Sequence, residues 1–198
     1  MKICMIITAA GMSTRQNTNK LLIRVCGETI IEKTVNSFLH QNLDIFVVVG
    51  HQLDKVESIL YHRFRNDIEI IENVDYESGI SSSIKAGILA AGKCDYYGFC
   101  NGDKPYIQSK TIEQILSYLK ENRPMILVPL FQEQSGHPTF FSKEIIDKFK
   151  AISGDIGGQQ VIQKFPSDVV YLSVNDEGVV MDMDKKLEKQ NNQESTNG

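Results

Sequence analysis

Small residues and two cations share one loop near the N-terminus of the chain. The stretch TAAGMSTRQNTNKLL follows a short apolar run and contains Ala9, Ala10, Gly11, Arg15 and Lys20. Small residues let backbone N–H groups approach a ligand closely, and arginine and lysine suit phosphate oxygens. This composition predicts a triphosphate site. The alternative is a strand-to-helix turn whose two cations are only solvated.

This loop differs from the two best-known phosphate-binding loops. A Walker loop needs the pattern GxxxxGK[ST], and a dinucleotide-binding loop needs GxGxxG. Residues 7–20 contain one glycine, Gly11. The phosphates must therefore be held in another way.

Carboxylates from two distant segments could complete the site. Asp103 follows the apolar segment YYGFCNG, and a hard oxygen ligand at the end of a strand suits Mg²⁺. Asp182 and Asp184 are two apart on an extended segment, so both could face one cation. The alternatives are a turn residue before Pro105 for Asp103 and a solvated acidic pair for Asp182 and Asp184.

Three serines follow Gly79 where a helix is expected to begin. The hydroxyls and free N–H groups of Ser81, Ser82 and Ser83 could bind the Watson–Crick edge of a base or an anion. The residues alone are equally consistent with a helix N-cap that has spare hydroxyls.

Short β-branched runs alternate with segments of helical period, and these elements must position the candidate residues. We expect strands at 2–8, 45–50, 68–72, 96–101, 125–129 and near 169–174, and helices at 29–41, 52–64, 81–91, 111–119 and near 143–152. Several strands are apolar on both faces, as in parallel sheets that helices cover. The order predicts an α/β three-layer fold. Ligands bind such sheets at the carboxyl ends of strands, where Gly11 and Asp103 fall.

Composition and charge exclude several classes of protein. The chain has 198 residues, 41% of them apolar, and a net charge of −4 without a basic run, which disfavours binding to nucleic acid. No stretch reaches the roughly 20 apolar residues that span a bilayer, and the N-terminus lacks the features of a signal peptide. We therefore expect a cytoplasmic protein without a nucleic-acid or membrane partner.

The chain shows no internal linker. We therefore expect a single domain over residues 1–186, and the polar composition of 187–198 predicts a disordered tail. The four cysteines, Cys4, Cys26, Cys94 and Cys100, are widely spaced and lack a CxxC pair. We expect them to be buried, reduced thiols.

Six segments resemble, in order, the signature motifs of the MobA-like nucleotidyltransferases. They are TAAGMSTRQNTNKLL, GISSSIKAG (79–87), NGDKP (101–105), SGHPTFF (135–141), SGDIGGQQ (153–160) and VVMDMDKKLE (179–188). The pattern is most similar to the molybdenum cofactor cytidylyltransferases. The resemblance implies a Rossmann-like nucleotidyltransferase fold with a mostly parallel central sheet. It also implies Mg²⁺-dependent transfer of CMP from CTP to the phosphate of molybdopterin cofactor, with release of pyrophosphate.

The resemblance also implies roles for individual residues. Arg15 would bind the outgoing phosphates, Lys20 the α-phosphate, and Asp103 with Asp184 the metal, with Asp182 in support. The nucleotide would contact Ala9, Ala10, Gly11, Ser13, Gly79, Ser81, Ser82 and Ser83, and the acceptor would contact His137 and Asp155. Ala10 favours cytosine, because related guanylyltransferases carry AGG in place of AAG.

Four departures from the family pattern leave the acceptor open. Gln16-Asn17 replaces Met-Gly, Lys104 stands where methionine is common, Gln159-Gln160 where arginine is usual, and Lys185-Lys186 replaces Thr-Pro. One alternative is transfer to another small phosphorylated acceptor, such as a sugar or polyol phosphate, or with GTP as the donor. A second is a non-catalytic carrier that delivers the cofactor to a molybdenum hydroxylase. The choice between Mg²⁺ and Mn²⁺ also stays open.

Overall fold

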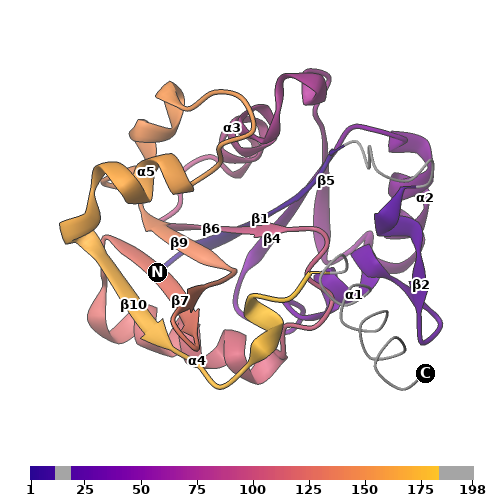
Figure 1. Cartoon of the computed structure of the whole chain (residues 1–198). Coiled ribbons are helices and arrows are strands. Elements are labelled where there is room, and N and C mark those ends of the chain that lie inside the picture. Colours follow the sequence, from indigo (N-terminus) through magenta and orange to yellow (C-terminus); the bar gives the residue numbers. More distant parts are fainter. Residues whose placement is uncertain (12–18, 183–198) are drawn as a thin grey trace, which may run out of the picture.

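A computed structural model describes residues 1–11 and 19–182 of the chain (Figure 1). Ser13, Arg15, Asp184 and the tail 187–198, all subjects of predictions above, lie outside the described residues. No helix within the described residues is long and apolar enough to cross a membrane. That residues 1–186 form a single domain stays a prediction.

A central sheet of eight strands forms the middle layer. Its order is β10-β7-β9-β6-β1-β4-β5, and β8 pairs with β7. The strands are β1 (Ile3–Ala9), β4 (Asp44–Val49), β5 (Ile68–Glu72), β6 (Tyr96–Asn101), β7 (Ile126–Phe131), β8 (Gln134–Ser135), β9 (Thr139–Ser142) and β10 (Val169–Ser173). Neighbours pair in parallel, except that β9 is antiparallel to β6 and β7, and β8 to β7. The mostly parallel sheet is confirmed.

Helices cover both faces of this sheet, as the alternating pattern predicted. The helices α1 (Ile30–Asn36), α2 (Leu53–Phe64) and α4 (Ser109–Asn122) pack with Ile3, Met5 and Ile7 of β1 in one buried cluster. The helices α3 (Ile80–Ala91) and α5 (Gln159–Lys164) pack with Cys4 and Ile6 in another. Successive residues of β1 thus face opposite layers, as strand geometry requires.

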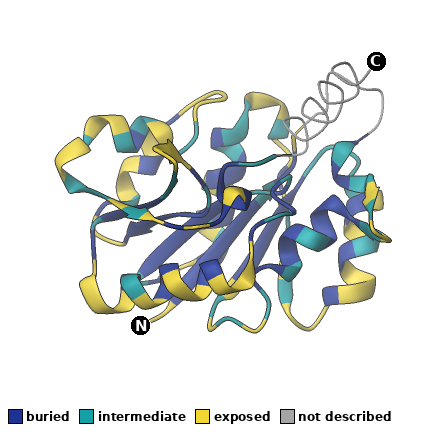
Figure 2. Cartoon of the chain, turned by 60° about the horizontal axis from the view of Figure 1, so that its bottom comes forward, coloured by how far each residue is buried: buried dark blue, intermediate teal, exposed yellow. Residues whose placement is uncertain are grey.

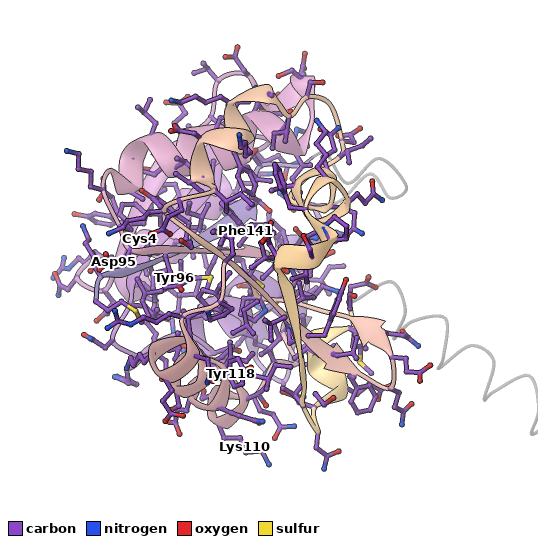
Figure 3. The ribbon with its side chains drawn as sticks, turned by 90° about the vertical axis from the view of Figure 1, so that its left-hand side faces the viewer. Cys4, Asp95, Tyr96, Lys110, Tyr118 and Phe141 are labelled. Carbon is purple, nitrogen blue, oxygen red and sulfur yellow. A yellow bond between two sulfur atoms is a disulfide. The ribbon has the colours of Figure 1, made fainter. Side chains whose placement is uncertain are left out.

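The figures show the same three layers. In Figure 2 the buried strands lie between helices whose outer surfaces are exposed. Figure 3 shows Phe141 on one side of the sheet and Tyr118 of α4 on the other.

Two helix predictions differ from the structure. The expected helix 29–41 is shorter, because the chain leaves helical geometry after Asn36 and turns at His40, whose φ is 63°. It begins at a capping box in which Thr29 and Glu32 bond to each other's backbone N–H groups. The helix expected near 143–152 is a 3₁₀-helix at Ile146–Ala151. In addition, a short hairpin of β2 (Arg24–Val25) and β3 (Glu28–Thr29) precedes α1.

The prediction of buried, reduced cysteines is wrong at three of the four positions. Cys4 of β1 and Cys94, which precedes β6, form a disulfide, and Cys26 is exposed. Because β1 and β6 are paired neighbours, residues 90 apart in the sequence come to lie with Cα atoms 6.2 Å apart. Cys100 is free and buried, as expected.

Candidate active site

The first loop opens onto a cavity of about 380 Å³ at the carboxyl ends of β1 and β6. This is where an open α/β sheet binds ligands. Its lining includes Ala9, Ala10, Gly11, Lys20, Asn101, Asp103, Tyr76, Gly79, Ser83 and Asp155. Five separate segments of the sequence therefore meet around one space.

Buried neighbours hold Lys20 at the edge of this cavity. Lys20 opens a 3₁₀ turn, η1 (Lys20–Leu22), between Asn19 and Leu21, which are 4% and 5% exposed. The side-chain oxygen of Asn19 accepts a hydrogen bond from the backbone N–H of Leu21 at 3.1 Å and so caps the turn. The anchored neighbours hold the backbone of Lys20 at the edge of the cavity.

Asp103 approaches the same place from the end of β6. The Gly102 N–H donates to the Thr8 carbonyl at 2.9 Å, which continues the pairing of β1 and β6. A Cβ atom at Gly102 would lie 3.2 Å from that carbonyl and 3.1 Å from Ile31. The next residue, Asp103, therefore turns into the cavity where the two strands end.

The two side chains form an ion pair. Lys20 Nζ lies 2.7 Å from Asp103 Oδ2, and the Asp103 side chain is 13% exposed. The other carboxylate oxygen, Oδ1, is buried and has no hydrogen-bond partner among the residues that the structure describes. Because an unpaired buried carboxylate oxygen is costly, this atom fits a cation bound beside it. The described residues contain no cluster of three His, Cys, Asp or Glu side chains that could hold a metal.

The first turn of α3 forms another wall, but its serines do not cap the helix. The N-cap residue is Gly79, and no side chain among the described residues accepts a hydrogen bond from the backbone N–H groups at the start of the helix. Gly79 has a φ of 97°, and a Cβ atom there would lie 2.4 Å from the backbone of Gly154, so glycine is required. Of the three serines, Ser83 lines the cavity, whereas Ser81 and Ser82 are not among its lining residues.

A second cavity of about 280 Å³ adjoins the first and shares Asp155 and Asn101 with it. Its floor and walls come from the β6, β9 and β7 side of the sheet, including Phe99, Phe141 and Val128. His137 also lines it, so both residues expected to contact the acceptor border this space. Sequence reasoning missed the apolar walls, because isolated aromatic residues in strands usually indicate core packing.

His137 is uncharged at neutral pH. Burial and the nearby charge of Lys104 lower the pKa of His137 from 6.5 to about 4. Its Nδ1 lies 3.3 Å from the Phe99 carbonyl oxygen, to which a neutral ring can donate one proton. The other ring nitrogen, Nε2, is then a hydrogen-bond acceptor.

Lys104 contacts the C-terminal segment beside the site. It is 6% exposed, and its Nζ lies 3.4 Å from the Val180 carbonyl oxygen and 3.8 Å from Asp182 Oδ2. The His137 N–H also donates to the Val179 carbonyl at 2.8 Å. Asp182 therefore lies next to the loop that carries Asp103. In the sequence, the only signal for this contact was that Lys104 stands where methionine is common in the family.

Comparisons with known proteins identify the family of this chain. Residues 5–169 match the model of the MobA-like NTP transferase domain. The chain is 29% identical over 140 residues to the molybdenum cofactor cytidylyltransferase of Escherichia coli K12, covering 70% of this chain and 69% of that protein. It is 28% identical over 137 residues to the bifunctional protein GlmU of Listeria monocytogenes, covering 67% of this chain but 29% of that longer protein.

Solved structures share the fold. The crystal structure of Rv0371c from Mycobacterium tuberculosis superposes with a TM-score of 0.77 at 19% identity, over 87% of this chain and 88% of that one. A structure of the same protein in complex with manganese has a TM-score of 0.71 at 18% identity, over 87% and 88% of the two chains. The match to the domain model spans most of the sequence, and the chain belongs to the MobA-like NTP transferase family of nucleotidyltransferases.

Proposed function

We propose that the protein transfers CMP from CTP to the phosphate of molybdopterin cofactor and releases pyrophosphate. The observation that carries this proposal is the Lys20–Asp103 pair at the edge of a cavity lined by the small residues of the first loop. The similarity to the E. coli cytidylyltransferase supports the choice of acceptor and donor. Ala10, which lines the cavity, supports cytosine over guanine.

The reaction needs no nucleophile from the protein. An oxygen of the acceptor phosphate attacks the α-phosphorus of CTP, and the bond to the bridging oxygen breaks in line so that pyrophosphate leaves. Lys20 would donate from Nζ to the α-phosphate or the bridging oxygen, where negative charge grows. Arg15 would bind the departing phosphates. Backbone N–H groups of the first loop would orient the triphosphate.

Asp103 is suited to bind a divalent cation. Its Oδ1 is buried without a partner in the described part of the chain, while Oδ2 is held by Lys20, so the carboxylate is fixed in direction and Oδ1 is available to a cation. Asp184 would supply a second oxygen, as the family pattern implies. When bound, Mg²⁺ or Mn²⁺ supplies positive charge that neutralises phosphate oxygens. The solved complex of Rv0371c with manganese supports a divalent cation as the cofactor.

The second cavity is proposed as the acceptor site. A flat ring system could lie between its aromatic and aliphatic walls, and the carboxylate of Asp155 and the neutral His137 would accept hydrogen bonds from ring N–H groups. Among the lining residues that the structure describes, Asp155 is charged and no lysine or arginine is present.

That charge pattern also favours a second candidate acceptor. A sugar or polyol phosphate carries its charge on the reacting phosphate alone and offers hydroxyl donors to Asp155 and His137. A relative 30% identical over 152 residues is a probable UDP-N-acetylglucosamine pyrophosphorylase of a mimivirus, of which this chain covers 58%. The same cavity could therefore receive a hydroxylated ring.

The test is a scan of pyrophosphate release over four NTPs, with molybdopterin cofactor or sugar phosphates as acceptors. We expect release with CTP and molybdopterin cofactor, and its loss on chelation with EDTA. Release with GTP or with a sugar phosphate alone would replace the first proposal by its alternative. Tight binding of the cofactor without release under any condition would indicate a carrier for a molybdenum hydroxylase.

A further inference from the structure

The side chain of Asn73 connects the end of β5 to the first turn of α3. Asn73 is 5% exposed, and its backbone N–H donates to the Val49 carbonyl at 2.8 Å. Its side-chain oxygen accepts a hydrogen bond from the Asp75 N–H at 3.1 Å. Because the oxygen is used in this way, the amide nitrogen is directed to α3.

The amide nitrogen of Asn73 donates to two serine hydroxyls. Asn73 Nδ2 lies 2.8 Å from Ser82 Oγ and 3.0 Å from Ser83 Oγ. An amide NH₂ group has two protons, so both are used. Each serine oxygen thus accepts one hydrogen bond from Asn73 and keeps its own proton to donate.

The two serines use that proton differently. Ser82 donates it to the Gly79 carbonyl at 2.8 Å, within its own helix. Ser83 is 4% exposed, lines the first cavity, and has no acceptor for its proton among the described residues. Because Asn73 occupies one lone pair of Ser83 Oγ, the hydroxyl proton is free to point into the cavity.

The strand order indicates which part of a nucleotide would meet this hydroxyl. Along the sheet, the order runs β9-β6-β1-β4-β5. The second cavity lies on the β9 and β6 side, Asp103 follows β6, and Asn73 follows β5. A triphosphate bound at Lys20 and Asp103, with the acceptor on the β9 side, leaves the β4 and β5 side for the nucleoside.

We propose that Asn73 is a positioning residue that presents the Ser83 hydroxyl as a hydrogen-bond donor to the base or ribose of the bound NTP. This inference rests on the proposed function, because it requires a nucleotide in the first cavity. It assigns Ser83, rather than Ser81 or Ser82, the direct contact. It also predicts that the recognised nucleoside atom is an acceptor, such as a ring carbonyl or a ribose oxygen.

The experiment measures CTP affinity by isothermal titration calorimetry in the full chain. Ser83→Ala removes the donor and should weaken CTP binding about tenfold, the effect of one lost hydrogen bond. Asn73→Asp should weaken it by a similar factor, because a carboxylate accepts from both serines and redirects the Ser83 proton. Ser78→Ala is the matched control, since the Ser78 hydroxyl donates to the Asp75 carbonyl at 2.6 Å and lies outside both cavities.

A double-mutant cycle separates positioning from a general effect of the added charge. If Asn73 acts through Ser83, the variant with both substitutions should bind CTP as weakly as Ser83→Ala alone. Pyrophosphate affinity should not change in Ser83→Ala. Three results would each overturn the inference. The losses of CTP affinity in the two single variants could multiply in the double variant, Ser82→Ala could lose as much CTP affinity as Ser83→Ala, or Ser83→Ala could bind pyrophosphate more weakly than the wild type.

The wild-type protein distinguishes failure of this inference from failure of the proposed function. Wild-type chain that binds no NTP would refute the proposed function. Wild-type chain that binds CTP while Ser83→Ala binds it equally well would refute the inference alone. Thermal unfolding of each variant shows that the binding loss does not arise from unfolding.

Discussion

Lys20 Nζ and Asp103 Oδ2 lie 2.7 Å apart, although 83 residues separate them in the sequence. The pair joins the loop after β1 to the loop after β6, the two neighbouring strands that end at the first cavity. The lysine ammonium group has three N–H donors, so Lys20 can keep its bond to Asp103 Oδ2 and also donate to a phosphate oxygen. A cation bound at Asp103 Oδ1 would then lie on the other side of the same carboxylate.

Asp103→Asn should reduce turnover at least a hundredfold while the fold survives. The substitution keeps the size of the side chain but removes the charge that suits a divalent cation and Lys20. Asp95→Asn is the control, because Asp95 precedes the same strand at its other end and pairs with Lys143 at the surface. Pyrophosphate release at saturating Mg²⁺ measures the effect. Equal activity in the two variants would remove Asp103 from the metal site.

Lys20→Met should lower kcat more than it raises the KM for CTP. The charge of Lys20 is expected to act where negative charge develops, so its loss should reduce kcat about a hundredfold. The substitution also leaves the largely buried Asp103 without its partner and should lower the unfolding temperature by several degrees.

Lys110→Met is the control for Lys20→Met. Lys110 is exposed at the start of α4, and Figure 3 shows it at the outer surface of that helix. The same chemical change there should leave both kcat and the unfolding temperature within error of the wild-type values. A Lys20 variant that changed KM alone would show that the lysine binds the ground state and the transition state equally.

The sequence predicted the elements whose patterns are local. The ranges 68–72 and 96–101 match β5 and β6 residue for residue, and the burial of β1 on both faces led to the correct layers. The convergence of Gly11, Lys20 and Asp103 at one cavity also followed from the rule that strand ends carry sites. These inferences need only the period of each segment and the order of the segments.

Features that depend on tertiary neighbours could not be predicted in the same way. The strand β9 (Thr139–Ser142) is four buried residues long and follows Pro138, so it resembles a turn until β6 and β7 flank it. The disulfide of Cys4 and Cys94 depends on the β1–β6 pairing, and the role of Asn73 depends on the approach of β5 to α3. Such contacts join positions whose spacing carries no signal.

His137→Gln should flatten the pH dependence of stability between about pH 4 and 6.5. In the folded protein, burial lowers the pKa of His137 to about 4, while the unfolded chain has the ordinary value of 6.5. Between these values the unfolded state binds a proton that the folded state does not, so the free energy of unfolding falls as the pH falls. The full loss, reached below pH 4, is about 3 kcal/mol.

Urea unfolding of both proteins at a series of pH values tests this. Other groups titrate in the same window, so the informative quantity is the difference between wild type and variant. That difference should change by about 3 kcal/mol from pH 7 to pH 4, in the direction that favours the variant at low pH. A difference that stays constant would show that the pKa of His137 is the same in the folded and the unfolded state.

Reduction of the Cys4–Cys94 disulfide should destabilise the protein without affecting CTP binding. The bond closes a loop of 90 residues, and in the chain-entropy model a cross-link over that length destabilises the unfolded state by about 4.6 kcal/mol. Cys94→Ala should lower the unfolding temperature by about as much as dithiothreitol lowers it in the wild-type protein. Dithiothreitol should have no further effect on the Cys94→Ala variant. Cys100→Ala leaves the disulfide intact, so this variant should remain sensitive to the reductant.

The disulfide lies far from the cavity. It involves the start of β1 and the residues before β6, whereas the cavity lies at the opposite ends of both strands. CTP affinity should therefore persist below the unfolding transition. Loss of affinity in folded, reduced protein would mean that the bond shapes the site as well as the chain.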